Sequence, residues 1–154
     1  MPRPPDDGRM AGYSSTPLPR KLGIKSGSRV AFLHAPNGFA RTLGELPKGV
    51  RVTTQVRTES DLAVLFVTTA ATLRREFPRL VSRIATNGML WVAWPKKASG
   101  LKTDLSFDVV QRAGLSTGLV DTKICAIDDT WSGLRFVRRL EDRKASAAAR
   151  TRGA

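Results

Sequence analysis

The chain has 154 residues, a mass of 16.8 kDa and a formal net charge of +13, a size that suits one domain. Its 41% hydrophobic and 25% charged residues exclude a disordered, collagen-like or disulfide-rich protein, and its single cysteine excludes an internal disulfide. No apolar run is long enough for a transmembrane helix, and residues 1–9 lack a secretory core, so we predict a cytoplasmic location.

Segments rich in apolar and β-branched residues predict the strands. Three nearly continuous apolar runs are typical of strands buried on both faces, and these are residues 29–34, 61–67 and 88–94. Residues 50–56 alternate between apolar and polar, which indicates a strand nearer an edge. Residues 123–127 and 134–137 predict an antiparallel hairpin with a polar turn around Asp128.

Between these strands, apolar residues recur at the spacing of a helix. Four helices are predicted, over residues 17–22, 38–46, 69–86 and 103–114. Thr103 and Asp104 are expected to cap the last helix, and Asn87-Gly88 to stop the third one. Pro78 interrupts the third helix, so we expect a kink or a restart there.

This order of elements predicts a three-layer α/β fold with a mostly parallel, doubly wound sheet of the methyltransferase-like type and a C-terminal antiparallel hairpin. In open sheets of this kind, ligands lie beyond the carboxyl ends of the parallel strands. Four loops are expected at that edge, and these are residues 34–38, 68–69, 95–100 and 128–132.

A nucleotide-like cofactor needs a glycine-rich turn after the first strand and a carboxylate at the end of the second strand, where it binds ribose hydroxyls. Residues 34–38 contain one glycine and one proline, and the strand at 50–56 is followed by no acid until Glu59. We therefore predict no cofactor, and a degenerate S-adenosylmethionine-dependent methyltransferase remains an alternative.

Several short blocks carry a resemblance to a known family. They are residues 12–18, 21–24, 35–39, 118–121 and 129–134, together with Leu90-Trp-Val-Ala-Trp-Pro-Lys-Lys-Ala-Ser-Gly100. Together they resemble the bacterial domain of unknown function numbered 3052, over nearly all of residues 12–138. The resemblance implies a bacterial cytosolic protein and no particular chemistry, and His34 departs from the small or amide residue expected at its position.

Two loops at the predicted carboxyl edge hold the candidate ligand-binding residues. The stretch after Trp94 places two cations and a hydroxyl at the end of a strand, where they could bind a phosphate or a carboxylate. The hairpin loop adds an aromatic face, a hydroxyl and acidic acceptors. The candidate residues are Lys96, Lys97, Ser99, Asp129, Trp131 and Ser132. The plainer alternative is that the lysines are solvated, Trp131 closes the core and the aspartates cap the hairpin.

No catalytic residue and no metal site is predicted. His34 is the only histidine, which excludes a histidine-based metal cluster, and we expect it to be a partly buried turn residue. Cys125 lies within a strand, where a thiol usually serves as an inert apolar filler. Asp121 and Lys123 are two residues apart, so we expect them on one face of that strand.

The positive charge suggests a nucleic-acid partner, but about half of the excess lies in residues 1–27 and 138–154. Arg75, Arg79 and Arg83 add a basic stripe on the predicted helix 69–86, which could follow a phosphate backbone.

The predicted organisation is a disordered segment over residues 1–11, one domain over 12–140 and a basic disordered tail over 141–154. The main functional prediction is a non-catalytic domain that binds a small anionic ligand or a protein partner at the carboxyl edge of its sheet. A nucleic-acid-binding protein that uses its basic tails is a second alternative. No membrane contact is expected, and the oligomeric state stays open.

Overall fold

The computed structural model describes residues 16–56 and 59–144. Its strands are β1 (Arg29–Leu33), β2 (Arg51–Thr53), β3 (Ser60–Phe66), β4 (Ile84–Pro95), β5 (Leu119–Ala126) and β6 (Trp131–Arg138). Its helices are α1 (Leu18–Leu22), α2 (Phe39–Leu43), α3 (Ala70–Val81), α4 (Phe107–Leu115) and a short 3-10 helix, η1 (Lys97–Ser99). The predicted segment 1–11 and residues 145–154 of the predicted tail lie outside the described residues.

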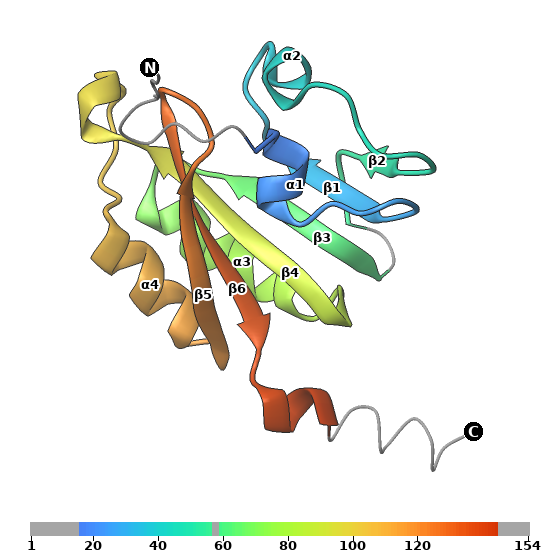
Figure 1. Ribbon diagram of the computed structural model, residues 1–154. Helices are drawn as coiled ribbons and strands as arrows, with labels where there is room; N and C mark the ends of the chain where they lie inside the picture. Colours follow the sequence, from blue (N-terminus) through green and yellow to red (C-terminus); the bar gives the residue numbers. More distant parts are fainter. Residues whose placement is uncertain (1–15, 57–58, 145–154) are drawn as a thin grey trace, which may run out of the picture.

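The strands form one sheet in the order β2-β1-β3-β4-β6-β5 (Figure 1). From β2 to β4 the neighbouring strands are parallel, and β6 lies antiparallel between β4 and β5. Helices α3 and α4 pack against one face of this sheet, and α1 and α2 against the other. The predicted three-layer, methyltransferase-like α/β fold with its antiparallel hairpin is therefore confirmed.

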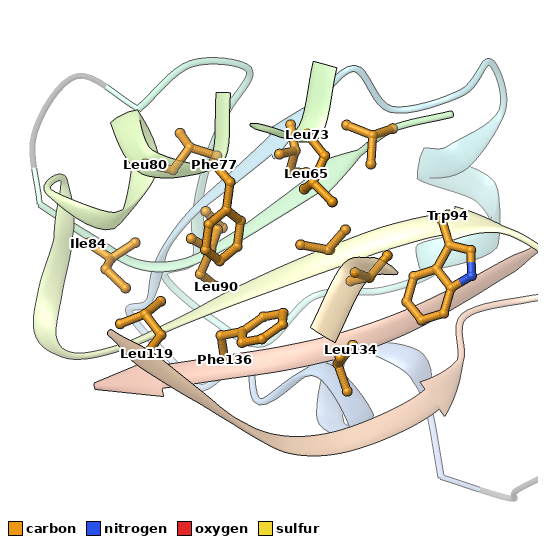
Figure 2. Packing of buried hydrophobic residues seen from close by; sticks show 14 of the residues in the cluster. Leu65, Leu73, Phe77, Leu80, Ile84, Leu90, Trp94, Leu119, Leu134 and Phe136 are labelled. Carbon is orange, nitrogen blue, oxygen red and sulfur yellow. The ribbon is translucent and has the colours of Figure 1, made fainter. Parts of the chain in front are cut away.

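Both faces of the sheet are apolar because its central strands consist almost entirely of apolar residues. Along β3, Val64 and Phe66 pack in the cluster under α1 and α2, whereas Leu65 packs in the cluster under α3 and α4. Figure 2 shows the second cluster, in which the rings of Phe77 and Phe136 meet edge to face, 5.3 Å between centroids. Full burial of one such side chain contributes about 1.5–3 kcal/mol.

The predicted helix 69–86 is shorter in the structure, because α3 ends and β4 begins before residue 86. Ile84 is 3% exposed and pairs with Ser60 of β3, so pairing with the sheet overrides the continuing helical pattern. The expected stop at residues 87–88 is wrong, since both lie within β4. Pro78 neither ends nor restarts the helix. It is exposed, and α3 continues through it to Val81.

Two other predicted elements also have different bounds. The helix predicted over 103–114 begins only after Ser106, whose side chain caps α4. The strand predicted over 50–56 is reduced to the three exposed residues of β2. The Thr53 hydroxyl donates to the Gln55 carbonyl at 2.7 Å directly after it, which turns the chain away from the sheet.

The strands of the predicted hairpin are longer than expected, and β6 already begins at Trp131. A bulge in β5 separates Asp121 from Lys123, so the expectation that they share one face is wrong. The carboxylate of Asp121 accepts from Gln111 of α4, 3.3 Å away, whereas Lys123 donates to the carbonyl of Lys21 in α1 at 3.2 Å. The two charges therefore lie on opposite faces of the sheet.

The chain continues past β6 with a short helical segment. Residues 140–144 are helical, which extends regular structure four residues beyond the predicted end of the domain at residue 140. Among the residues that the structure describes, no helix combines the length and the apolar character that crossing a membrane requires.

Candidate functional site

The sheet has one topological switch point. From β1 the chain crosses to β2 on one side, and from β3 it crosses to β4 on the other side. The crevice beyond the carboxyl ends of β1 and β3 is the place where open α/β sheets bind ligands. His34 follows β1 there, and Thr68 follows β3, and both residues are exposed.

The turn after β1 uses two residues in left-handed conformations. His34 has a φ of 60°, which is uncommon for a residue with a side chain, and Gly38 has a φ of 83° at the start of α2. A Cβ atom placed on Gly38 would meet nothing within 4 Å. The backbone of this turn is therefore open to approach by a ligand.

His34 is tied to α3 through Glu76. Its Nε2 lies 2.8 Å from Glu76 Oε1, and Arg75 donates to the other carboxylate oxygen at 3.3 Å. Partial burial disfavours the charged form of Glu76, but the hydrogen bond from His34 and the charges of His34 and Arg75 outweigh it and hold the pKa of this carboxyl below its ordinary value. The sequence predicted a partly buried turn residue; His34 does lie in a turn, but it is exposed, and its partner, 42 residues away, was not predicted.

The turn after β3 is braced by the segment before α4. The Thr103 hydroxyl donates to the Thr68 carbonyl at 2.6 Å, and the Ala70 amide donates to Asp104 Oδ1 at 2.8 Å. Asp104, which we expected to cap the helix that follows it, therefore caps α3 instead. The Thr69 side chain accepts from the Thr72 amide and adds the cap that is local in sequence.

A cavity of about 230 Å³ lies at the carboxyl end of β1, between the residues that follow β2 and helix α3. Gln55, Glu76, Arg79 and Arg83 supply its polar groups, and Leu33 is among its apolar ones. The structure thus places two residues of the predicted basic stripe, Arg79 and Arg83, at a cavity, and the third one against Glu76. The cavity itself was not predicted, because it depends on how α3 lies over β1.

The predicted loops after β4 and β5 meet at one edge, as their positions in the fold require. The Lys96 amide donates to the Thr130 carbonyl at 2.8 Å. Ser99 closes its own turn, since its hydroxyl donates to the Lys96 carbonyl at 2.7 Å and accepts from the Leu101 amide at 3.2 Å. Lys97 is exposed. The hydroxyl expected to face a ligand therefore has a structural role.

The hairpin loop is held by an aspartate next to the predicted one. Asp128 Oδ1 accepts from the amides of Thr130 and Trp131, both at 2.8 Å, whereas Asp129 is exposed. Trp131 is 8% exposed and packs edge to face on Phe66, 5.2 Å between centroids, so its ring closes the core. Ser132, the last candidate residue, is half-buried and pairs in register with Trp94 of β4.

Cys125 is half-buried in β5, near Lys21 and Lys123. Burial raises the pKa of its thiol above the ordinary value and outweighs the two lysines, which act in the opposite direction. A thiol that resists ionisation is a poor nucleophile. Over the part of the chain that the structure describes, no three histidine, cysteine or acidic side chains gather as metal ligands.

Comparisons with known proteins find likeness only at the level of structure. No protein-family model and no curated protein matches the chain. Three of the similar solved structures are TrmN from Thermus thermophilus, a ribosomal protein L11 methylase from Lactobacillus delbrueckii subsp. bulgaricus, and Aeropyrum pernix fibrillarin with natively bound S-adenosyl-L-methionine. Each is 12% identical to this chain.

These likenesses cover most of the present chain. It is covered to 79%, 79% and 82%, with TM-scores of 0.52, 0.54 and 0.50 in the same order. The matched shares of those three proteins are 47%, 75% and 70%, so the chain spans about half the length of TrmN. At this identity the likeness establishes the fold.

The likeness corrects the main functional prediction. Methylases and methyltransferases recur among the structural neighbours, which overturns the prediction of a non-catalytic domain that binds a small anionic ligand or a protein partner. The findings favour the methyltransferase-like alternative. The resemblance to the domain of unknown function 3052 stays a prediction.

Proposed function

We propose that this protein is a degenerate methyltransferase-like protein that binds S-adenosylmethionine in the crevice between the carboxyl ends of β1 and β3. The observation that carries the proposal is the open turn after β1, located at the only switch point of the described sheet. The neighbours that share this fold include a fibrillarin with bound S-adenosyl-L-methionine.

The residues of the crevice fit part of such a cofactor. The left-handed conformations of His34 and Gly38 expose backbone after β1, and exposed Thr68 lies across the crevice. The end of β2 does not fit, because Gln55 stands near the position where a carboxylate normally binds the ribose hydroxyls. For this reason we describe the protein as degenerate, and we assign it no methyl-transfer step.

Isothermal titration of the full-length protein with S-adenosylmethionine and S-adenosylhomocysteine tests the proposal. We expect saturable binding, and Gly38→Ala should weaken it about tenfold or more, because the new methyl group occupies the space through which a ligand reaches the backbone.

Gly118→Ala is the matched control. Gly118 also has a left-handed φ, 93°, and open space around its Cβ position, but it precedes β5 at the opposite edge of the sheet. Its substitution should carry a similar backbone strain and leave the affinity for the cofactor unchanged. Absence of binding at millimolar cofactor, or equal losses in both variants, would reject the proposed function.

A further inference from the structure

The outer surface of α3 carries an excess of unpaired positive charge. Arg74, Arg75 and Arg79 are exposed on α3, and Arg83 is exposed in the turn that follows it. Arg75 pairs with Glu76, whereas among the described residues no acidic side chain lies within ion-pair distance of Arg74 or Arg79. Guanidinium groups without acidic partners are free to bind phosphate oxygens.

Two of these arginines, Arg75 and Arg79, lie about one turn apart on α3, about 6 Å along the helix axis. Arg83 lies in the turn that follows α3, which ends at Val81. Arg79 and Arg83 both line the 230 Å³ cavity beside β1. The basic surface and the cavity are therefore one continuous feature.

The cavity has the character of a pocket for a base rather than for a whole ligand. Leu33 and Leu80 give it apolar walls, and Gln55 supplies an amide that can both donate and accept. Its volume is below the roughly 300–1,000 Å³ of sites that enclose a complete small molecule. Arg83 is already oriented, since its Nη1 donates to the Val56 carbonyl at 2.9 Å.

We propose that this surface binds a single-stranded nucleic acid. The phosphates lie along Arg79 and Arg83, and one base enters the cavity that these arginines line and pairs with the Gln55 amide. A base can enter such a pocket only when it is unstacked, which single strands allow and duplexes resist. The net charge of +13 draws the strand to the protein. This binding goes beyond the proposed cofactor site: Gln55 lies near both, whereas Arg79 and Arg83 take part in the nucleic-acid surface alone.

Fluorescence anisotropy with a fluorescein-labelled oligouridylate of about 12 nucleotides tests the proposal on the full-length protein. Arg79→Gln should weaken binding about tenfold and reduce the slope of log affinity against log salt by about 0.7. Gln55→Ala should weaken binding severalfold and leave the salt slope unchanged, because it removes a contact to the base and no charge.

Arg41→Gln is the control for charge alone. Arg41 is exposed on α2, on the opposite face of the sheet, and its substitution makes the same change in net charge. It should change the affinity less than twofold.

Three results would overturn the proposal. One is no binding at 50 mM salt, and another is an equal loss of affinity in Arg41→Gln and Arg79→Gln. The third is that duplex DNA binds as tightly as the single strand, which would indicate non-specific electrostatic binding to nucleic acid. Unfolding curves of the variants confirm that each exposed substitution leaves the fold intact.

Discussion

His34 Nε2 lies 2.8 Å from Glu76 Oε1, and this contact joins the turn after β1 to the middle of α3. His34 holds a left-handed φ of 60°, a conformation that is costly for a residue with a Cβ atom. The hydrogen bond to Glu76 links the strained turn to α3, whose apolar face is buried against the sheet. Glu76 also lines the cavity beside β1.

The first prediction concerns this pair and pH. Because the folded-state pKa of Glu76 is lowered from 4.5, its contribution to stability is complete above about pH 4.5 and is lost as the pH falls through the lowered value. Glu76→Gln should therefore lower the melting temperature at pH 7, and the difference from the parent protein should shrink as the pH falls below about 4.5 toward pH 3. Asp108→Asn, an exposed substitution on α4, makes the same change in net charge and serves as the control. A difference of equal size at both pH values would contradict this account.

The second prediction separates the two neighbouring aspartates of the hairpin loop. Asp128→Ala removes the acceptor of two backbone amides, so it should lower the free energy of unfolding by about 1–3 kcal/mol in urea denaturation. Asp129→Ala removes an exposed carboxylate and should stay within about 0.5 kcal/mol of the parent. Similar losses in both variants would show that the loop is not held by Asp128.

The third prediction concerns the helix that Asp104 caps. Asp104→Ala should destabilise the protein by about 1 kcal/mol and speed hydrogen exchange at the first turn of α3, where the Ala70 amide loses its acceptor. Asp108→Ala, in the first turn of α4, serves as the comparison. If faster exchange appears in α4 instead, Asp104 caps the helix that follows it in sequence.

The fourth prediction tests the contact between α4 and the sheet. A Cβ atom on Gly114 would overlap the buried ring of Phe136, so Gly114→Ala should destabilise the protein by about 1–3 kcal/mol, although alanine favours helices. Phe136→Leu in the same chain should recover part of this loss, which a double-mutant cycle of unfolding free energies would measure. If the losses in unfolding free energy of the two single variants simply add in the double variant, the strain does not arise from contact with Phe136.

The candidate site shows where prediction from sequence ends. The four loops at the carboxyl edge follow from the order of strands and helices, and the structure brings two of them together at Lys96 and Thr130. The roles of single residues in these loops do not follow. Asp128, rather than Asp129, holds the hairpin, and Trp131 belongs to the core, because burial depends on register with β4.

The sequence by itself determined the class of fold and its three layers. Continuous apolar runs predict strands that are buried on both faces of a sheet. The predicted helices each have an apolar face that can pack on such a sheet, so few other architectures are compatible with the sequence. These features depend on local periodicity, which a single chain displays directly.

The tertiary structure alone decided the ends of the elements and the make-up of the site. Ile84 pairs with Ser60 although the helical pattern includes it, and a bulge sends Asp121 and Lys123 to opposite faces. His34 and Glu76 meet although 42 residues separate them. Such contacts depend on strand register and on the placement of helices over the sheet, which are set by packing between distant segments and have no local signal in the sequence.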